Sequence, residues 1–190
     1  GDLTRRTYPL FSDHSTVFPG GIVAAADSMG MIWGVTLCNG QLIVCDGTRV
    51  LIYNNPSALT NGHAADDVYG DVSFELQSAD AYYGYPHTDA AGHLWISKRG
   101  GANTLLAFNS PLTHNSVPIR QIVLTDGSLT DLEGDPVQVA GSDMIDYALV
   151  GSGSAIWVAD TWRSRVFRIS NLDGSVRPGT GPYVDVVLGQ

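Results

Sequence analysis

Basic residues are scarce in this sequence. Ten Lys and Arg residues stand against nineteen Asp and Glu residues, which gives a formal net charge of −9. The basic residues form no cluster larger than the pairs Arg5-Arg6 and Lys98-Arg99. Because contacts to phosphate groups depend on clustered Lys and Arg, the composition argues against nucleic-acid binding.

Long apolar runs are also absent. A helix that crosses a membrane needs about 20 consecutive, mainly apolar residues. The sequence contains no uninterrupted stretch of that kind. We therefore expect no membrane insertion.

Cysteine occurs only twice, at Cys38 and Cys45. A two-residue turn at Asn39-Gly40 would place Cys38 opposite Gln41 and Cys45 opposite Gly34. The two thiols would then lie several residues apart along the hairpin, whereas a disulfide needs Cα atoms within about 7 Å. An internal disulfide is therefore not expected. Cysteine usage leaves the cellular compartment open.

Helical periodicity is missing as well, since no window sustains an i, i+3, i+4, i+7 apolar pattern over a dozen residues. Short apolar, β-branched or aromatic runs bounded by Gly, Asn, Asp and Ser take its place, and such runs predict strands. Asn39-Gly40 predicts a tight hairpin, because a type I′ turn needs positive φ at both central residues. The chain is therefore expected to be all-β and built from consecutive antiparallel hairpins.

The strand pattern repeats. VCDGTRVLIYNN at residues 44–55 returns as VADTWRSRVFRIS at residues 158–170, and the second copy closes on PYVDVVLGQ. A weaker copy, HLWISKRGGANTLLAFNSPL, begins at His93, with Lys98 in place of the aspartate and Thr104 in place of the arginine. These residues resemble the NHL repeat of bacterial β-propellers.

This resemblance implies an all-β propeller of NHL type with about three four-stranded antiparallel blades per chain, either half of a six-bladed ring or a partial propeller. The expected blades cover residues 31–74, 82–126 and 143–190, after an N-terminal segment at residues 1–30 that supplies at most one edge strand. A long acidic connection at residues 125–144 is expected to protrude. The expected strands, from the innermost outwards, are 33–37, 42–45, 50–53 and 67–69; 83–87, 94–97, 105–108 and 119–124; and 147–150, 156–159, 166–169 and 183–188.

Three blades are fewer than the 4 to 8 of typical propellers. The outer faces of the terminal blades would need cover, because apolar faces in repeat proteins are normally stacked or capped. Two copies of the chain could complete a ring, the chain could be a piece of a longer protein, or a three-blade arc could stand alone. We favour self-association into a homodimer.

Aspartate and arginine recur together at the ends of two expected strands. Asp46 precedes Arg49, and Asp160 precedes Arg165, each across a turn. A bidentate ion pair or a turn-capping hydrogen bond explains this recurrence. We therefore expect both pairs to be structural.

Polar and aromatic residues mark a candidate ligand site. Tyr83, Tyr85 and His87 alternate, which predicts that they share one face of a strand. Asp89 follows them, and Asp146 precedes the corresponding strand of the third unit. In a propeller the innermost strands line the channel, so these residues would form a channel mouth that holds a small ligand or a metal. Alternatively, the tyrosines pack between blades and His87 is a solvated strand end.

The sequence contains no HExxH, GxSxG, P-loop or dinucleotide-binding motif. We therefore assign no catalytic or metal-binding residues and expect a non-catalytic binding or scaffold module without a cofactor, which recognises a protein, a glycan or a small ligand. The alternative is a metal-dependent hydrolase or lyase with zinc or calcium in the central channel, so enzymatic activity stays open. The resemblance to secreted bacterial propellers favours a secreted or periplasmic protein.

Overall fold

The computed structural model of the chain describes residues 25–27, 29–70, 81–100, 103–124, 129–131, 133–135, 137, 150–152, 154–160, 163–172 and 181–189. Within these ranges the protein is all-β, as predicted, apart from short 3-10 segments such as η3 (Pro56–Ala58). Among the described residues, no helix has the length and apolarity that crossing a bilayer requires.

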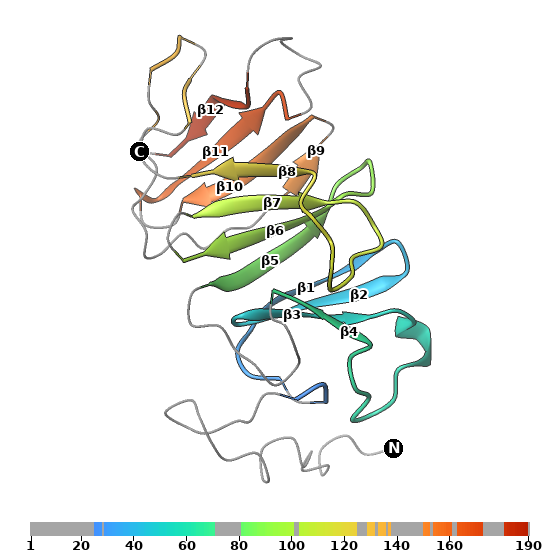
Figure 1. The fold of residues 1–190 in the computed structure, drawn as a ribbon. Helices are drawn as coiled ribbons and strands as arrows, with labels where there is room; N and C mark the ends of the chain where they lie inside the picture. Colours follow the sequence, from blue (N-terminus) through green and yellow to red (C-terminus); the bar gives the residue numbers. More distant parts are fainter. Residues whose placement is uncertain are drawn as a thin grey trace.

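The strands form three four-stranded antiparallel sheets that follow one another along the chain (Figure 1). Within each sheet the strands lie side by side in sequence order. The first sheet contains β1 (Ile32–Cys38), β2 (Gln41–Asp46), β3 (Arg49–Tyr53) and β4 (Asp67–Tyr69). The second contains β5 (Tyr82–Thr88), β6 (Leu94–Arg99), β7 (Thr104–Phe108) and β8 (Arg120–Val123). The third contains β9 (Val150–Ser152), β10 (Ala155–Asp160), β11 (Arg165–Ser170) and β12 (Tyr183–Leu188).

The strand positions agree closely with those expected from the sequence. The one partial match is β9, which overlaps the expected strand at residues 147–150 only at its end; residues 147–149 lie outside the described residues. The hairpin between β1 and β2 also forms as expected. Asn39 and Gly40 both have positive φ, 45° and 83°, as a type I′ turn requires.

The cysteine register follows from this turn. Cys38 pairs with Gln41 and Cys45 pairs with Gly34 across the β1–β2 ladder. Both cysteines are buried and free, so they serve the core as small apolar side chains.

Each sheet has two faces, which we call forward and rear. The forward face of a sheet is turned toward the sheet that follows it in the chain, and the rear face is the opposite one. Because successive side chains of a strand point to opposite faces, Trp95 lies on the forward face of the second sheet while Leu94 and Ile96 lie on its rear face. The forward face of each sheet therefore packs against the rear face of the next.

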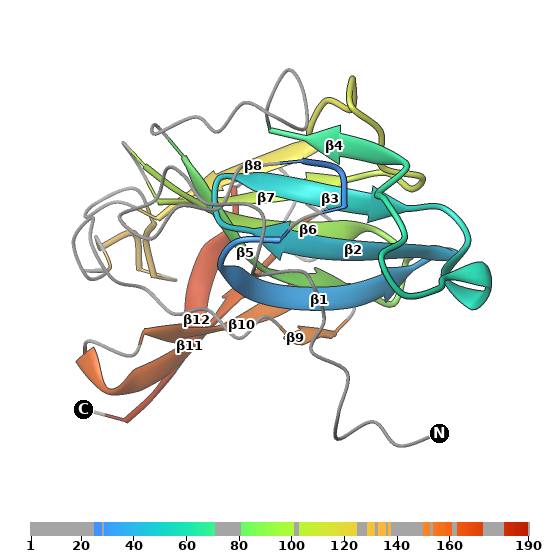
Figure 2. The same cartoon turned by 90° about the horizontal axis from the view of Figure 1, so that it is seen from below.

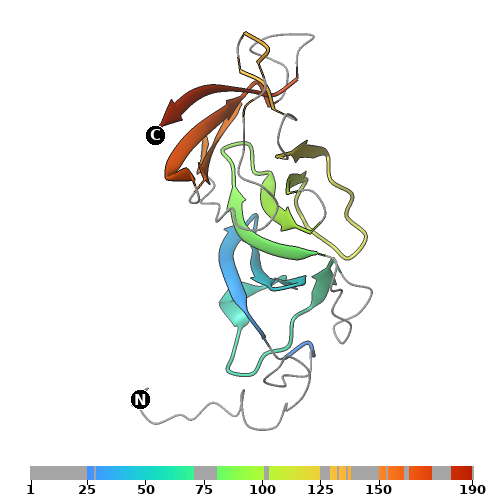
Figure 3. The ribbon, with the colours of Figure 1, turned by 90° about the vertical axis from the view of Figure 1, so that its left-hand side faces the viewer.

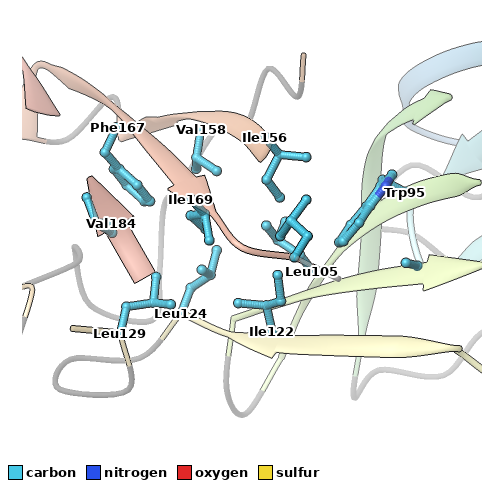
Figure 4. Close-up of a cluster of buried hydrophobic side chains, with 12 residues drawn as sticks. Trp95, Leu105, Ile122, Leu124, Leu129, Ile156, Val158, Phe167, Ile169 and Val184 are labelled. Atoms are coloured by element: carbon cyan, nitrogen blue, oxygen red, sulfur yellow. The ribbon is translucent and has the colours of Figure 1, made fainter. Parts of the chain in front are cut away.

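Two apolar clusters fill the spaces between the sheets. The cluster between the first and second sheets includes Ile43, Ile52, Leu94, Leu106 and Phe108. The cluster between the second and third sheets is drawn in Figure 4, where Trp95 and Leu105 point toward side chains of β10 and β11. Burying one such aliphatic or aromatic side chain stabilises the fold by about 1.5–3 kcal/mol, so these clusters hold the sheets together.

The innermost strands of the first two sheets approach each other most closely. β1 and β5 run beside each other (Figure 3), and glycines allow the close approach. A Cβ atom added to Gly34 would lie 2.7 Å from Cδ of Pro86 and 3.3 Å from Cα of Tyr85, and one added to Gly84 would lie 3.3 Å from Cβ of Trp33. The sheets therefore converge at their first strands.

Hydrogen bonds also join the first two sheets. The side chain of Gln41 donates from Nε2 to the carbonyl of Leu112 at 3.0 Å and accepts from the amide of Leu112 at 2.7 Å. The amide of Tyr83 donates to the carbonyl of Gly47 at 2.7 Å. Unpaired buried polar groups are costly, so these bonds fix how the second sheet sits on the first.

The connection at residues 125–144 was expected to protrude, and this expectation is wrong for Leu129 and Thr130; residues 125–128, 132, 136 and 138–144 lie outside the described residues. Leu129 is 2% exposed and belongs to the cluster between the second and third sheets, and Thr130 accepts a hydrogen bond from the amide of Val184 at 2.8 Å. An apolar side chain and the unpaired outer edge of β12 explain this anchoring, since both gain from contact with the chain. The base of the connection is therefore part of the fold.

The described part of the N-terminal segment binds its own chain. The amide of Ala65 donates to the carbonyl of Ala26 at 2.8 Å, and Met29 packs with Leu59 over the rear face of the first sheet. Residues 25–27 and 29–31, which we call the strap, form no strand. Figure 2 looks onto the first sheet from this end of the molecule. The rest of the segment for which an edge strand was expected, residues 1–24, lies outside the described residues.

The close approach of β1 and β5 yields a test. Replacing Gly34 by Ala should lower the free energy of unfolding by about 1–3 kcal/mol, because an added methyl group in a packed region forces its neighbours apart. Gly181→Ala is the matched control, since nothing lies within 4 Å of an added Cβ there. Urea denaturation measures both changes. Equal stability of the two variants would show that β1 and β5 are not held this closely.

Candidate functional site

The sequence placed Tyr83, Tyr85 and His87 on one face of β5, and this expectation is wrong for the two tyrosines. The pairing of β5 with β6 shifts register between Gly84 and His87, and Tyr85 has a positive φ of 47°. This geometry is a β-bulge, in which an extra residue reverses the alternation of side chains.

The bulge sends the tyrosines into different clusters. Tyr83 is buried between the first and second sheets, where its ring meets that of Tyr69 at a centroid distance of 5.8 Å. Tyr85 packs against the cluster between the second and third sheets and meets Trp33 edge-on at 6.5 Å. Both tyrosines therefore pack between sheets and form no shared binding surface.

Asp89 is the centre of a hydrogen-bond network just beyond β5. Its Oδ1 accepts from the amides of Ala91 at 2.9 Å and His93 at 2.8 Å. Its Oδ2 accepts from Nε1 of Trp95 at 2.9 Å and lies 3.0 Å from Nδ1 of His93. The Asp89 side chain is only 6% exposed, so the carboxylate fixes the turn into β6 and the position of Trp95.

The electrostatics of this region follow from the same contacts. Burial alone would raise the pKa of Asp89, but the hydrogen bonds from Trp95 and His93 outweigh burial and hold the pKa below its ordinary value. Burial lowers the pKa of His87, although the nearby Asp89 carboxylate opposes this. Asp89 is therefore a weak base whose carboxylate oxygens already accept hydrogen bonds. His87 favours the neutral form.

A small cavity of about 90 Å³ adjoins Asp89, between the second and third sheets. Arg120 and His93 give it a polar wall, and Leu172 closes it from the third sheet. Asp146, the remaining residue of the expected channel mouth, lies outside the described residues. Among the residues that the structure describes, no group of three His, Cys, Asp or Glu side chains is placed to hold a metal ion.

The first recurrent ion pair forms between Asp46 and Arg49. Asp46 Oδ2 accepts from Arg49 Nε at 2.9 Å and from Nη2 at 2.8 Å, and both side chains are fully buried. Asp46 Oδ1 accepts from the amide of Gly30 at 2.6 Å, and Arg49 Nη1 donates to the carbonyl of Ala25 at 3.1 Å. The pair therefore attaches the strap to the turn between β2 and β3.

The second pair joins Asp160 and Arg165 at the equivalent turn of the third sheet. Arg165 Nε donates to Asp160 Oδ2 at 3.0 Å, with the aspartate side chain fully buried and the arginine side chain 14% exposed. Each pair therefore joins the end of one strand to the start of the next, across the turn between β2 and β3 or between β10 and β11.

Sequence reasoning missed a third pair, between Arg168 and Asp185. Arg168 donates from Nε at 2.8 Å and from Nη2 at 2.7 Å to the two carboxylate oxygens, and Ser170 donates to the same carboxylate at 3.0 Å. The Arg168 guanidinium also lies 5.5 Å from the ring centroid of Trp157. These bonds from Arg168 and Ser170 lower the pKa of Asp185, against the effect of burial. Alternation along β10 and β11 indicates that Trp157 and Arg168 share one face. No local pattern indicates Asp185, because it lies where the pairing of β11 with β12 shifts register.

Sequence reasoning also missed an apolar cavity in the described part of the chain. A cavity of about 290 Å³ lies at the rear face of the first sheet, between the strap, β2, β3 and the loop after η3. Its walls are mainly apolar, and its polar groups are the side chains of Asp27, Thr60 and His63. The apolar lining consists chiefly of Met29, Ile32, Leu42, Tyr53 and Leu59.

Comparisons with known proteins leave the family unassigned. No model of a known protein family matches the chain, and no curated protein matches it either.

The buried ion pairs yield a ranked prediction. Asp46→Ala should lower the free energy of unfolding by about 3–5 kcal/mol, because it leaves the guanidinium of Arg49 buried without its carboxylate. Asp160→Ala should cost less, about 0.5–3 kcal/mol, because Arg165 reaches solvent. Chemical denaturation of both variants gives the two losses. A larger loss of stability for Asp160→Ala than for Asp46→Ala would contradict this ranking.

The network at Asp89 predicts a pH dependence. Because the pKa of Asp89 is lower in the folded protein than in the unfolded chain, its stabilisation is present above the ordinary carboxyl pKa of about 3.9 and is lost as the pH falls through the folded value. The stability difference between wild type and Asp89→Asn should therefore be largest above about pH 5 and shrink toward about pH 2. Urea denaturation across this range measures the difference, and one that does not change with pH would contradict the prediction.

Proposed function

We propose that the protein is a non-catalytic binding or scaffold module of the NHL β-propeller type, which recognises a protein, a glycan or a small ligand. The observation that carries the proposal is the pre-formed cavity of about 290 Å³ on the rear face of the first sheet. Concave, mainly apolar sites with a few polar groups are typical of ligand recognition.

Exposed apolar side chains beside the cavity support a binding role. Ile32, Val35 and Leu37 of β1 are 54%, 58% and 63% exposed. Val35 and Leu37 pair across the ladder with Val44 and Leu42, which places them on the rear face with the cavity. Contiguous exposed apolar surface marks interaction sites more often than single exposed residues do.

The repeated architecture supports the propeller part of the proposal. Each sheet is a four-stranded meander that begins at its inner strand, and successive sheets pack forward face to rear face. The first strands of the first two sheets, β1 and β5, are in close contact, as expected for blades that converge on a central axis.

Two copies of the chain would complete such a propeller. Three sheets are fewer than the 4 to 8 blades that close a ring, and the forward face of the third sheet has no following sheet among the described residues. We therefore propose a homodimer of six sheets as the working form of the protein.

The chemistry of the described residues favours binding over catalysis. Both carboxylate oxygens of Asp89 already accept hydrogen bonds, from the amides of Ala91 and His93 and from the indole of Trp95. Burial, with Asp46 nearby, raises the pKa of the Cys45 thiol far above neutrality, and the protonated thiol is a poor nucleophile. Neither group is therefore prepared for catalysis.

Light scattering tests the assembly. At micromolar concentration the purified protein should have twice the mass of the 20.2 kDa chain, because an obligate interface of the expected kind buries more than about 2,000 Å². A monomer under these conditions would refute the dimer.

Metal analysis separates the proposed function from its alternative, a metal-dependent hydrolase or lyase with zinc or calcium in the channel. Protein purified without chelators and then dialysed should retain far less than one metal ion per chain. A stoichiometric ion that survives dialysis would instead favour the enzyme, and substitution of Asp146 or His87 would then show whether the channel holds it.

A further inference from the structure

The two interfaces between neighbouring sheets bury side chains at equivalent strand positions. This regularity predicts a third interface. In the first interface, the cross-strand pair Ile43 and Ile52 lies on the forward face of the first sheet. It shares one cluster with the pair Leu94 and Phe108 on the rear face of the second sheet.

The second interface repeats this arrangement. Trp95 and Ala107 form the cross-strand pair on the forward face of the second sheet. They share a cluster with Ile156 and Ile169, which pair on the rear face of the third sheet (Figure 4). The strand positions are equivalent in the two interfaces. Compared with the forward pair of the same sheet, a rear pair lies one residue earlier in the second strand of that sheet and one residue later in the third strand.

The third sheet presents the next forward pair without a partner sheet among the described residues. Trp157 and Arg168 pair across β10 and β11 at the equivalent positions. Both side chains are half-buried, whereas their counterparts Ile43 and Ile52 are completely buried. Leu188, which pairs with Val166 on the same forward face, is 54% exposed.

The first sheet presents the corresponding rear pair, Leu42 and Tyr53, which face each other across β2 and β3. Both residues line the cavity of about 290 Å³. The cavity therefore lies at the position that a preceding sheet would fill with its forward pair.

This inference rests on the proposed assembly of two copies and identifies a second copy of the chain as the protein that the cavity recognises. We propose that the Trp157 and Arg168 side chains of one copy occupy the cavity over Leu42 and Tyr53 of the other copy. Apolar cavities of about 150 Å³ hold a benzene ring, so this larger cavity has room for the indole. Met29, Ile32 and Leu59 supply its apolar walls.

Charge complementarity supports the same occupant. The cavity is bordered by Asp27, and the Arg168 guanidinium, which is paired with Asp185 of its own chain, stacks on Trp157. The pKa of Tyr53, at the base of the cavity, is raised by burial and then by Asp46, Asp66 and Asp27, while Arg49 alone lowers it. The acidic residues near Tyr53 therefore favour the approach of a guanidinium that is stacked on an aromatic ring.

Two copies related by a twofold axis would make this contact twice, because each copy offers one forward face and one cavity. The same docking would cover Val35, Leu37 and Leu188, which are otherwise among the most exposed large apolar side chains of the described residues. The contact therefore removes apolar surface from water at both ends of each chain.

Complementary variants test the proposal. Ile32→Arg places a cation in the cavity opposite Arg168, and Trp157→Glu places a carboxylate opposite Asp27. Each variant alone should be monomeric by analytical ultracentrifugation at tens of micromolar. An equimolar mixture should form a 1:1 dimer, because the intact forward face of Ile32→Arg meets the intact cavity of Trp157→Glu.

Controls keep the test decisive. Val117→Arg and Val117→Glu alter a side chain that is 79% exposed outside both faces, and both should remain dimeric. Trp157→Ala should raise the dimer Kd roughly tenfold or more, as expected for a central aromatic anchor. Should Trp157→Glu fail to fold by circular dichroism, Leu188→Glu replaces it on the same face.

The outcomes separate this contact from the assembly as a whole. A dimeric wild type whose single variants also stay dimeric would leave the proposed assembly intact and overturn the cavity contact. Monomeric variants that stay monomeric when mixed would also overturn it, because they indicate like faces in contact. A monomeric wild type would overturn the assembly and the contact together.

Discussion

Apolar side chains on both faces of each sheet are the constraint on which the rest of the structure depends. In β7 all five residues are buried, and their alternation sends Leu106 and Phe108 to one neighbouring sheet and Leu105 and Ala107 to the other. A sheet of this kind is stable only when both faces are covered. The second sheet meets this condition within the chain, so it fixes the spacing and the order of the other two.

The outer faces of the terminal sheets meet the same constraint in different ways. On the first sheet, the strap covers part of the rear face and is held by the buried pair of Asp46 and Arg49. On the third sheet, Asp185 accepts two hydrogen bonds from Arg168 on the forward face, while Leu188 of the same face is 54% exposed. A polar network thus anchors a cover on the first sheet, and on the third sheet it pairs a charge on the face that the proposed second copy would cover.

Local patterns made most strands predictable, because alternation and turn residues act over a few neighbouring positions. The recurrent Asp46 with Arg49 and Asp160 with Arg165 were visible for the same reason. The bulge at Tyr85 was not, since alternation continues through it in the sequence while the backbone reverses. The cavity was also invisible, because Met29, Leu42 and Leu59 come together only through the tertiary fold. No family match supplements the sequence at these points.

Contacts between sheets run only between neighbours, since no strand of the first sheet has substantial contact with a strand of the third among the described residues. Cooperativity in such a stack passes along one dimension, as in other repeat proteins, and each sheet depends on the one beside it. We expect the middle sheet, with two neighbours, to be the last to lose its protection, and the terminal sheets to open by local unfolding. An open row of sheets therefore has two ends from which it can unravel, whereas a closed row has none.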